Sequence, residues 1–249
     1  GFMFVNAAEL LRYTDSGWRE KDIVQFERML RTVYYPLLER FFPEANGNWD
    51  GAILNTMLCI GIFCDDREIF DRAVTNYLHG RANGGITKYI YPSGQCQETT
   101  RDQSHTQLGL REFATAARVA WNQGVDLYGV AENRLALGFE YTAKYMLGEE
   151  VSTYGGPASP QRRGRLSDIY ESIYQHYHHV QGLEMPYVAR AVEKKRNSRR
   201  WWSALTMYDG PLGKAPQRLG PPVPSSHAPR AGARSGPTAT PSVSAVRLC

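Results

Sequence analysis

The chain has 249 residues, of which 42% are hydrophobic, so it is long enough for one large domain with a packed core. No apolar run approaches the roughly 20 residues of a membrane-spanning helix, so we expect no membrane span. The formal net charge of +4 arises at the end of the chain, where Asp209 is the last acidic residue and five basic residues follow. The rest is near neutral, which gives no reason to expect a nucleic-acid partner.

Helical periodicity dominates the first third of the chain. Apolar residues at helical spacing predict a helix over residues 22–42, which Pro36 should kink or divide. Residues 48–63 are almost all apolar, as expected of a helix that is buried on all sides. Another helix is predicted over residues 67–78, with the preceding Asp65-Asp66 pair as its N-cap.

The helical pattern breaks at Asn83-Gly84-Gly85, and residues 86–92 are predicted to be extended or a loop. Helical spacing then resumes and continues through most of the following hundred residues. The later predicted helices cover residues 101–121, 131–146, 168–180 and 186–195, with a loop over residues 152–164.

The order of the helices predicts the architecture. A buried helix is repeatedly followed by an amphipathic one, which is typical of an all-α fold whose helical hairpins form an open or closed (α/α) toroid. Residues 214–249 hold seven of the fourteen prolines and no acidic or aromatic residue, so they cannot bury enough apolar surface to fold. We therefore predict one domain over residues 1–210 and a disordered tail over residues 211–249, although a frame-shifted end would also explain the abrupt change.

Cysteine and histidine spacing argue against a metal site. The four cysteines form no C-x-x-C pair, and Cys59 and Cys64 lie in an apolar helical stretch, as core thiols do. His176, His178 and His179 suggest metal binding, but a helix would spread these imidazoles around its axis. An aromatic, hydrogen-bonding wall is the preferred interpretation of this segment, and we expect neither a metal nor a cofactor.

Residues 89–107 form a polar stretch that leads into an apolar helix. Two tyrosines open it, as in surfaces that stack against sugars. Arg101 and His105 are four residues apart, so a helix would place them on one face. The alternative is a solvated loop and a first helical turn in which Asp102 interacts with the helix dipole.

A second polar cluster, residues 46–50, opens the buried helix. Asn48 or Asp50 could cap this helix. Polar groups at the mouth of an inner helix would also point into the central cleft of a toroid, so the cluster is a second candidate for a functional site.

Long blocks of the chain resemble the alginate-lyase domain superfamily. The resemblance covers residues 1–211 and implies an (α/α) toroid that cleaves 4-linked uronic-acid polymers by β-elimination. It also implies an acidic polysaccharide as the partner and a secreted or periplasmic parent protein. Residues 1–11 resemble an internal helix of the domain, so we expect its N-terminal hairpins to be missing. The blocks are residues 47–50, 63–67, 91–98, 101–107, 121–129, 138–145 and 182–187.

The chemistry of β-elimination assigns roles within the resemblance. A lyase must neutralise the uronate carboxylate, remove the weakly acidic C5 proton and protonate the departing O4. Asn48 matches the carboxylate-neutralising asparagine of the family, and Arg101 matches its arginine. His105 is the best candidate for the general base, since imidazole suits proton abstraction near neutrality. The candidate substrate-binding residues are Trp49, Tyr89, Gln95, Gln97, His176 and Tyr177.

Two departures from the family pattern leave questions open. Several alginate lyases place a histidine where this chain has Trp49, and they carry a tyrosine soon after the arginine, whereas none follows Arg101 before Tyr128. The acid that protonates O4 is therefore unassigned, with Tyr89, Tyr177 or a residue outside the chain as candidates. Glucuronan competes with alginate as the polymer.

Two other classes of function compete with the lyase. A glycoside hydrolase on the same toroid would use two carboxylates, such as Asp50 and Asp102. A carbohydrate-binding remnant would be inactive because its toroid is incomplete. Fold alone does not separate these three functions.

Overall fold

The computed structural model describes residues 1–81 and 83–197. Regular secondary structure within these residues is helical, apart from one antiparallel bridge between Ile90 and Cys96. The predicted all-α class is thus confirmed for the part of the chain that the structure describes. The predicted tail over residues 211–249 lies outside it.

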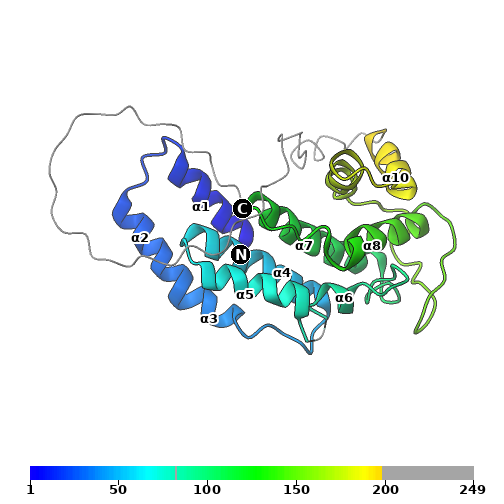
Figure 1. The fold of residues 1–249 in the computed structure, drawn as a ribbon, viewed down its shortest axis with the longest axis horizontal. Coiled ribbons are helices and arrows are strands. Elements are labelled where there is room, and N and C mark those ends of the chain that lie inside the picture. Colours follow the sequence, from blue (N-terminus) through cyan, green and yellow to red (C-terminus); the bar gives the residue numbers. More distant parts are fainter. Residues whose placement is uncertain (82, 198–249) are drawn as a thin grey trace.

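Most of the helices follow one another with short connections, and longer segments precede α7 and α9 (Figure 1). In chain order they are α1 (Phe2–Tyr13), α2 (Glu20–Met29), the π-helical turn η1 (Leu30–Tyr34), α3 (Tyr35–Leu38), α4 (Gly47–Phe63), α5 (Arg67–His79), α6 (Ile86–Tyr89), α7 (Gln103–Asn122), α8 (Val130–Met146), α9 (Tyr170–Tyr174), the π-helical turn η2 (Gln175–Val180) and α10 (Pro186–Arg196).

Helix α4 is the central element. Every residue of it except Trp49 and Ala52 is buried, as its apolar sequence predicts. Gly51 lies against Glu112 of α7, and Ile62 and Asn122 line one cavity at the other ends of these helices, so α4 and α7 run parallel.

Helix α1 packs against another face of α4 and also runs parallel to it. Gly1 lies against Thr56, and the guanidinium of Arg12 donates to the carbonyl of Phe63, 2.6 Å away. Three parallel helices, α1, α4 and α7, therefore lie side by side (Figure 1). The N-terminal ends of α4 and α7 point the same way, and both polar clusters of the sequence meet there.

Each of α4 and α7 is followed by an antiparallel partner. Helix α5 returns along α4, and Gly61 allows the close approach, because a Cβ there would lie 2.8 Å from the backbone nitrogen of Phe70. Helix α8 returns along α7, with Gly138 against Leu110. These hairpins match the predicted alternation, and their closure into a toroid stays a prediction.

Two local predictions need adjustment. Residues 86–92 contain one helical turn, α6, because burial of Ile86 and Tyr89 favours a compact turn over an extended segment. The helix predicted over residues 22–42 is interrupted by η1, where the amide of Tyr35 bonds the carbonyl of Leu30, five residues back. Pro36 follows in the first turn of α3, so this π-helical turn accommodates the proline.

Two other predictions are confirmed. The side chain of Asp66 caps α5 by accepting a hydrogen bond from the amide of Ile69, at 3.1 Å. Cys59 and Cys64 are buried core residues, and Cys96 is a third. Cys249 lies outside the described residues.

Candidate active site

The N-terminus of α7 holds a carboxylate–imidazole pair. Asp102 is the N-cap of the helix, and its Oδ1 accepts a hydrogen bond from the amide of His105 at 2.9 Å. The second carboxylate oxygen lies 2.5 Å from Nδ1 of the His105 ring. One residue therefore begins the helix and fixes the imidazole. About 35% of the His105 side chain remains exposed, so part of the imidazole can be reached from outside.

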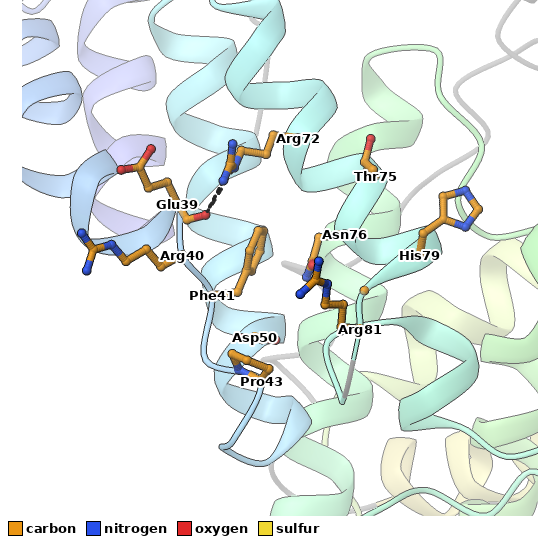
Figure 2. A pocket seen from close by; sticks show the side chains of 11 residues that line it. Glu39, Arg40, Phe41, Pro43, Asp50, Arg72, Thr75, Asn76, His79 and Arg81 are labelled. Atoms are coloured by element: carbon orange, nitrogen blue, oxygen red, sulfur yellow. Dashed lines mark hydrogen bonds between the residues drawn. The ribbon is translucent and has the colours of Figure 1, made fainter.

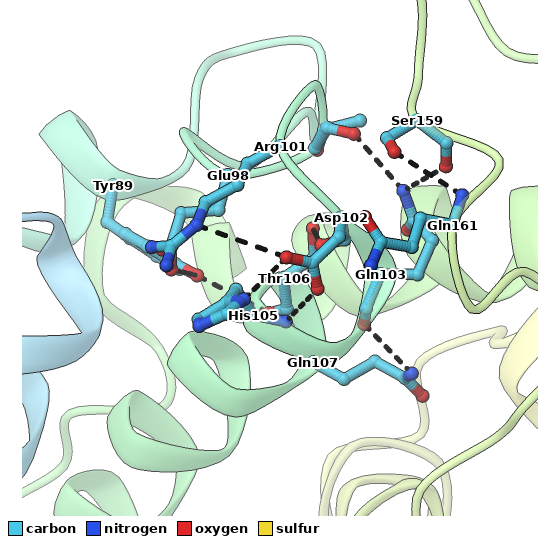
Figure 3. Close-up of polar contacts among 11 residues, drawn as sticks. Tyr89, Glu98, Arg101, Asp102, Gln103, His105, Thr106, Gln107, Ser159 and Gln161 are labelled. Carbon is cyan, nitrogen blue, oxygen red and sulfur yellow. Dashed lines mark hydrogen bonds and ion pairs between the residues drawn. The ribbon is translucent and has the colours of Figure 1, made fainter.

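Arg101 lies beside this pair but is not on the helix. Because Asp102 caps α7, the helix starts at Gln103, and the prediction that Arg101 and His105 share a helical face is wrong. They are brought together through Asp102 instead, whose Oδ2 lies 3.9 Å from Nε of Arg101. Figure 3 shows the Arg101 guanidinium next to the His105 ring.

Glu98 holds Arg101 in place. Its carboxylate accepts a hydrogen bond from the Arg101 guanidinium at 2.9 Å and another from the hydroxyl of Tyr89 at 3.3 Å (Figure 3). The Glu98 side chain is only 1% exposed, whereas that of Arg101 is 45% exposed. Glu98 thus anchors an arginine side chain that is nearly half exposed.

The two acids have opposite pKa shifts. Burial raises the pKa of Glu98, and electrostatic interactions with Arg101 and His105 only partly offset this effect. Burial also acts to raise the pKa of Asp102, but hydrogen bonds from the backbone and ring of His105 outweigh it, so that pKa lies below its usual value. Asp102 is therefore the stable anion of the cluster.

Asn48 approaches from the facing helix. It lies in the first turn of α4, and its side-chain oxygen is buried and without a hydrogen-bond partner within the described part of the chain. Asn48 lines a cavity of about 470 Å³ together with Leu108, which lies one helical turn after His105. Asn48 and His105 share no hydrogen bond among those of the described residues, and each lies at the N-terminal end of its helix.

A main-chain contact ties these two helix ends together. The amide of Gly47, the residue before Asn48, donates to the side-chain oxygen of Gln97 at 3.0 Å. Gln97 is next to Glu98 in sequence, so the polar loop that holds Arg101 also holds the start of α4. Gln97 is half-buried, and this hydrogen bond gives it a positioning role.

The cavity lined by Asn48 and Leu108 has an aromatic rim. Trp49 is 59% exposed and meets Phe42 edge to face, with ring centroids 5.8 Å apart. An exposed, fixed indole is suited to stacking on a sugar ring. Trp49 is therefore the predicted substrate-binding residue with the most accessible surface.

Two other predicted substrate-binding residues are buried beside the site. Tyr89 is completely buried and stacks on Phe113 at 4.9 Å, so its ring has no face left for a sugar. Gln95 is 2% exposed, and both ends of its amide bond the backbone of Tyr154, at 2.8 and 2.6 Å. Their polar groups support the fold, which corrects the expectation that they contact substrate.

The predicted wall around His176 and Tyr177 is part of the core. His176 is 3% exposed and stacks on Tyr128, with ring centroids 3.5 Å apart. Tyr177 is fully buried and donates its hydroxyl to the carbonyl of Tyr128 at 2.9 Å. Burial lowers the pKa of His176 to about 4. These residues form an aromatic cluster, not an exposed binding surface.

Glutamine side chains fasten the loop over residues 152–164 and its flanks to α7. Gln103 donates its amide to the carbonyls of Thr99 and Ser159, at 3.1 and 3.0 Å. Gln107 donates to the carbonyl of Arg165 and accepts from the amide of Ser167, at 3.1 and 2.9 Å. Figure 3 shows Gln103 and Gln107 on the helix turns that also carry His105. The catalytic candidates therefore lie on a braced segment.

The roles of two residues, Asp102 and Glu98, could not be predicted from the sequence pattern. The sequence pattern places Asp102 near the helix dipole or in the carboxylate pair of a hydrolase, and it gives Glu98 no role of its own. The spacing between Asp102 and His105 contains a signal for the first of these roles. An acidic N-cap three residues before a histidine can reach both the amide and the ring of that histidine. In the part of the chain that the structure describes, no group of three or more histidine, cysteine or acidic side chains is arranged to hold a metal ion.

Sequence comparison adds a family to this geometry. The model of the family described as Alginate lyase matches residues 2–152, which is more than half of the chain. Comparisons with curated proteins and with solved structures gave no match. Among the described helices, none is both long enough and apolar enough to cross a bilayer. The matched region contains Asn48, Arg101 and His105.

Proposed function

The chain belongs to the alginate lyase family of polysaccharide lyases, and we propose that it cleaves 4-linked uronic-acid polymers by β-elimination. The observation that carries this proposal is the accessible His105, held by Asp102 and adjacent to Arg101. An oriented base next to a fixed cation is what removal of a proton beside a carboxylate requires.

His105 removes the C5 proton. Asp102 accepts from Nδ1–H, which assigns the tautomer that leaves the lone pair on Nε2 free. As Nε2 takes the proton, the C5–H electrons form the C4=C5 double bond, and the C4–O4 bond breaks with its electrons on O4. Asp102 also stabilises the imidazolium that forms.

Arg101 and Asn48 act on the substrate carboxylate. Negative charge moves onto this group as the C5 proton leaves, so donors aimed at it stabilise the transition state more than the ground state. The Glu98 contact leaves part of the Arg101 guanidinium free to bind a carboxylate. The Asn48 amide would add a neutral donor from α4.

Protonation of O4 is assigned to His105 itself. Tyr89 and Tyr177, the two tyrosines considered for this role, are fully buried, and their hydroxyls are bonded within the core. The His105 imidazolium carries the abstracted proton and can return it to O4 when C5–H and C4–O4 lie on the same side of the sugar ring. This relation holds in mannuronate and glucuronate units but not in guluronate, the C5 epimer of mannuronate.

The hydrolase alternative lacks its pair of carboxylates. Asp50 accepts from the amide of Phe42 at 2.7 Å and lies against Gly84, on the α5 side of α4. Asp102 uses both oxygens on His105. The two acids therefore face different neighbours and do not flank one bond, as a hydrolase requires.

A panel of polymers tests the proposed function. The protein is incubated with polymannuronate, polyglucuronate, polyguluronate and a neutral 4-linked glucan, and the ultraviolet absorbance of the C4=C5 product is followed. We expect activity on the first two, little on polyguluronate and none on the glucan. New reducing ends without this absorbance would support the hydrolase, and binding without cleavage would support the inactive remnant.

A further inference from the structure

A second cavity, of about 660 Å³, lies on the other side of the first turn of α4. Its walls come from the end of α5 with the residues just after it and from the segment between α3 and α4. Arg72, Asn76 and Arg81 line it, as do Phe41 and Pro43 (Figure 2). None of these residues belongs to the Asn48–Arg101–His105 site.

The cavity contains cations that no carboxylate neutralises. Arg72 donates two hydrogen bonds, at 3.2 and 2.8 Å, to a neutral acceptor, the main-chain carbonyl of Glu39. Arg72 and Arg81 form no ion pair with any residue that the structure describes. In Figure 2 the carboxylate of Glu39 points away from Arg81. Asp50 is the acidic residue of the floor, and it is 3% exposed.

A neutral donor lies beside one of these cations. The Nδ2 group of Asn76 is buried and has no hydrogen-bond partner within the described residues. Figure 2 shows the Arg81 guanidinium next to the Asn76 side chain. An unbonded amide donor costs free energy unless a ligand satisfies it, and an adjacent guanidinium selects an anion. The pair Asn76 and Arg81 combines the same functional groups as Asn48 and Arg101.

The two cavities are neighbours. Phe41 and Pro43 line the basic cavity, whereas Phe42, between them, lines the cavity that contains Asn48 and Trp49. One three-residue segment therefore separates the catalytic candidates from the basic cavity. A polymer that leaves Asn48 and crosses the Phe42–Trp49 rim would next meet Arg72, Asn76 and Arg81.

We propose that the basic cavity is a subsite that binds the carboxylate of a further uronate unit of the same polymer. Arg81 and Asn76 donate to this carboxylate, and Arg72 adds positive charge. This inference rests on the proposed function, because it takes a polyuronate as the ligand. The subsite would favour long chains, since a short oligomer cannot occupy both cavities.

Arginine variants of the full chain test the subsite. Arg72→Ala, Arg81→Ala and the double variant are compared with Arg67→Ala, which removes a similarly exposed arginine from the opposite end of α5. Binding to long and short polyuronate oligomers, to a neutral 4-linked glucan and to inorganic phosphate is measured by calorimetry. Turnover is followed by ultraviolet absorbance.

We expect Arg81→Ala to weaken binding of long oligomers about tenfold, as loss of a charged hydrogen bond does, with kcat unchanged. Arg72→Ala should weaken it less, because Arg72 adds positive charge without donating to the ligand. Short oligomers and Arg67→Ala should show no such loss, and added salt should reduce the difference. An equal loss for long and short oligomers would overturn the subsite, and so would a loss seen only for phosphate.

The outcomes also separate the subsite from the proposed function. If the wild type cleaves polyuronate and the double variant binds it equally well, the subsite is wrong and the function stands. If the wild type binds polyuronate without cleaving it and the double variant binds more weakly, the subsite stands and the function is wrong. No binding of polyuronate by the wild type would overturn both.

Discussion

His105 and His176 lie in two regions that are both rich in aromatic and polar side chains, and the two histidines differ in almost every physical respect. At the start of α7, the His105 ring is held by a carboxylate and about a third of its side chain is exposed. In η2, His176 stacks on Tyr128, and its Nε2 contacts the amide of Gln181 at 3.0 Å. Burial keeps it neutral at physiological pH by lowering its pKa to about 4.

The difference teaches how a fold assigns roles to one residue type. A histidine that must cycle between neutral and charged forms needs a counter-charge and access to substrate, and His105 has both. A histidine that completes an apolar core must stay neutral, and its hydrogen bonds serve packing. Substitutions should therefore divide into those that affect turnover at α7 and those that affect stability at η2.

The largest expected effect comes from His105→Ala. Loss of the base should lower turnover by about 10²–10⁴-fold, the usual contribution of general-base catalysis. Among the described residues, the hydrogen bond of the ring is to Asp102, so the melting temperature should change little. Turnover is followed by ultraviolet absorbance and folding by thermal melting.

His179→Ala is the matched control, since this exposed histidine lies in η2 and away from the site. Wild-type turnover is expected for it. If His105→Ala instead melted early and kept its turnover per folded molecule, His105 would be a structural residue and the contrast with His176 would disappear.

Asn48→Ala should have the next largest effect. A lost donor to the charge that develops on the uronate carboxylate should cost about 10²–10³-fold in kcat, by analogy with other oxyanion donors. The side-chain oxygen has no internal partner within the described residues, so no hydrogen bond of the fold is lost with it. Single-turnover kinetics separates this loss from weaker binding, and a purely higher KM would contradict the role.

Asp102→Asn should lower turnover by a smaller factor, on the order of 10–100-fold, while the helix cap is kept because asparagine caps well. The amide would favour the other imidazole tautomer of His105, as described for triads. Nitrogen NMR of the ring reports the tautomer, and an unchanged tautomer would restrict Asp102 to capping α7.

The smallest expected effect is the loss of stability at low pH that results from burial of His176. An unfolded histidine titrates near 6.5, whereas burial lowers the pKa of His176 to about 4 in the folded protein. Between these values the unfolded state binds the proton and the folded state does not. The contribution of His176 to the free energy of unfolding is therefore fully present above about pH 6.5 and is lost as the pH drops towards 4. The loss should be about 1 kcal/mol per pH unit and should stop below about pH 4.

His176→Phe keeps an aromatic ring against Tyr128 and removes the titration. Chemical denaturation at pH 7 and pH 5 should show a smaller drop in the free energy of unfolding for this variant than for the wild type. Equal drops would mean that His176 does not control the acid sensitivity.

The sequence predicted the helices where one physical cause dominated. The apolar run of α4 and the Asp66 cap leave little choice, and both are as predicted. The turn α6 and the π-helical turns were missed because alternative backbone conformations of short segments differ little in energy. Tertiary packing decides between them.

Within the candidate site, the sequence indicates which residues have reactive side chains. It does not predict which of these side chains are exposed. Tyr89, Gln95 and Tyr177 have groups that suit sugars and equally suit buried hydrogen bonds. Which use prevails depends on which helices pack over them, and local sequence does not contain that information. Asp102 is a further case, because a cap and a histidine-orienting carboxylate look the same in sequence.

The glutamine side chains that fasten the loop over residues 152–164 indicate where slow chemical damage would affect this protein. Gln103 gives its amide protons to two carbonyls from inside the fold. Slow deamidation would replace this donor with a glutamate, whose oxygens would face the same carbonyls without a proton to share. A single chemical change, with almost no change in shape, would thus weaken the attachment of the loop to the helix that carries His105, while the Gln107 contacts remain.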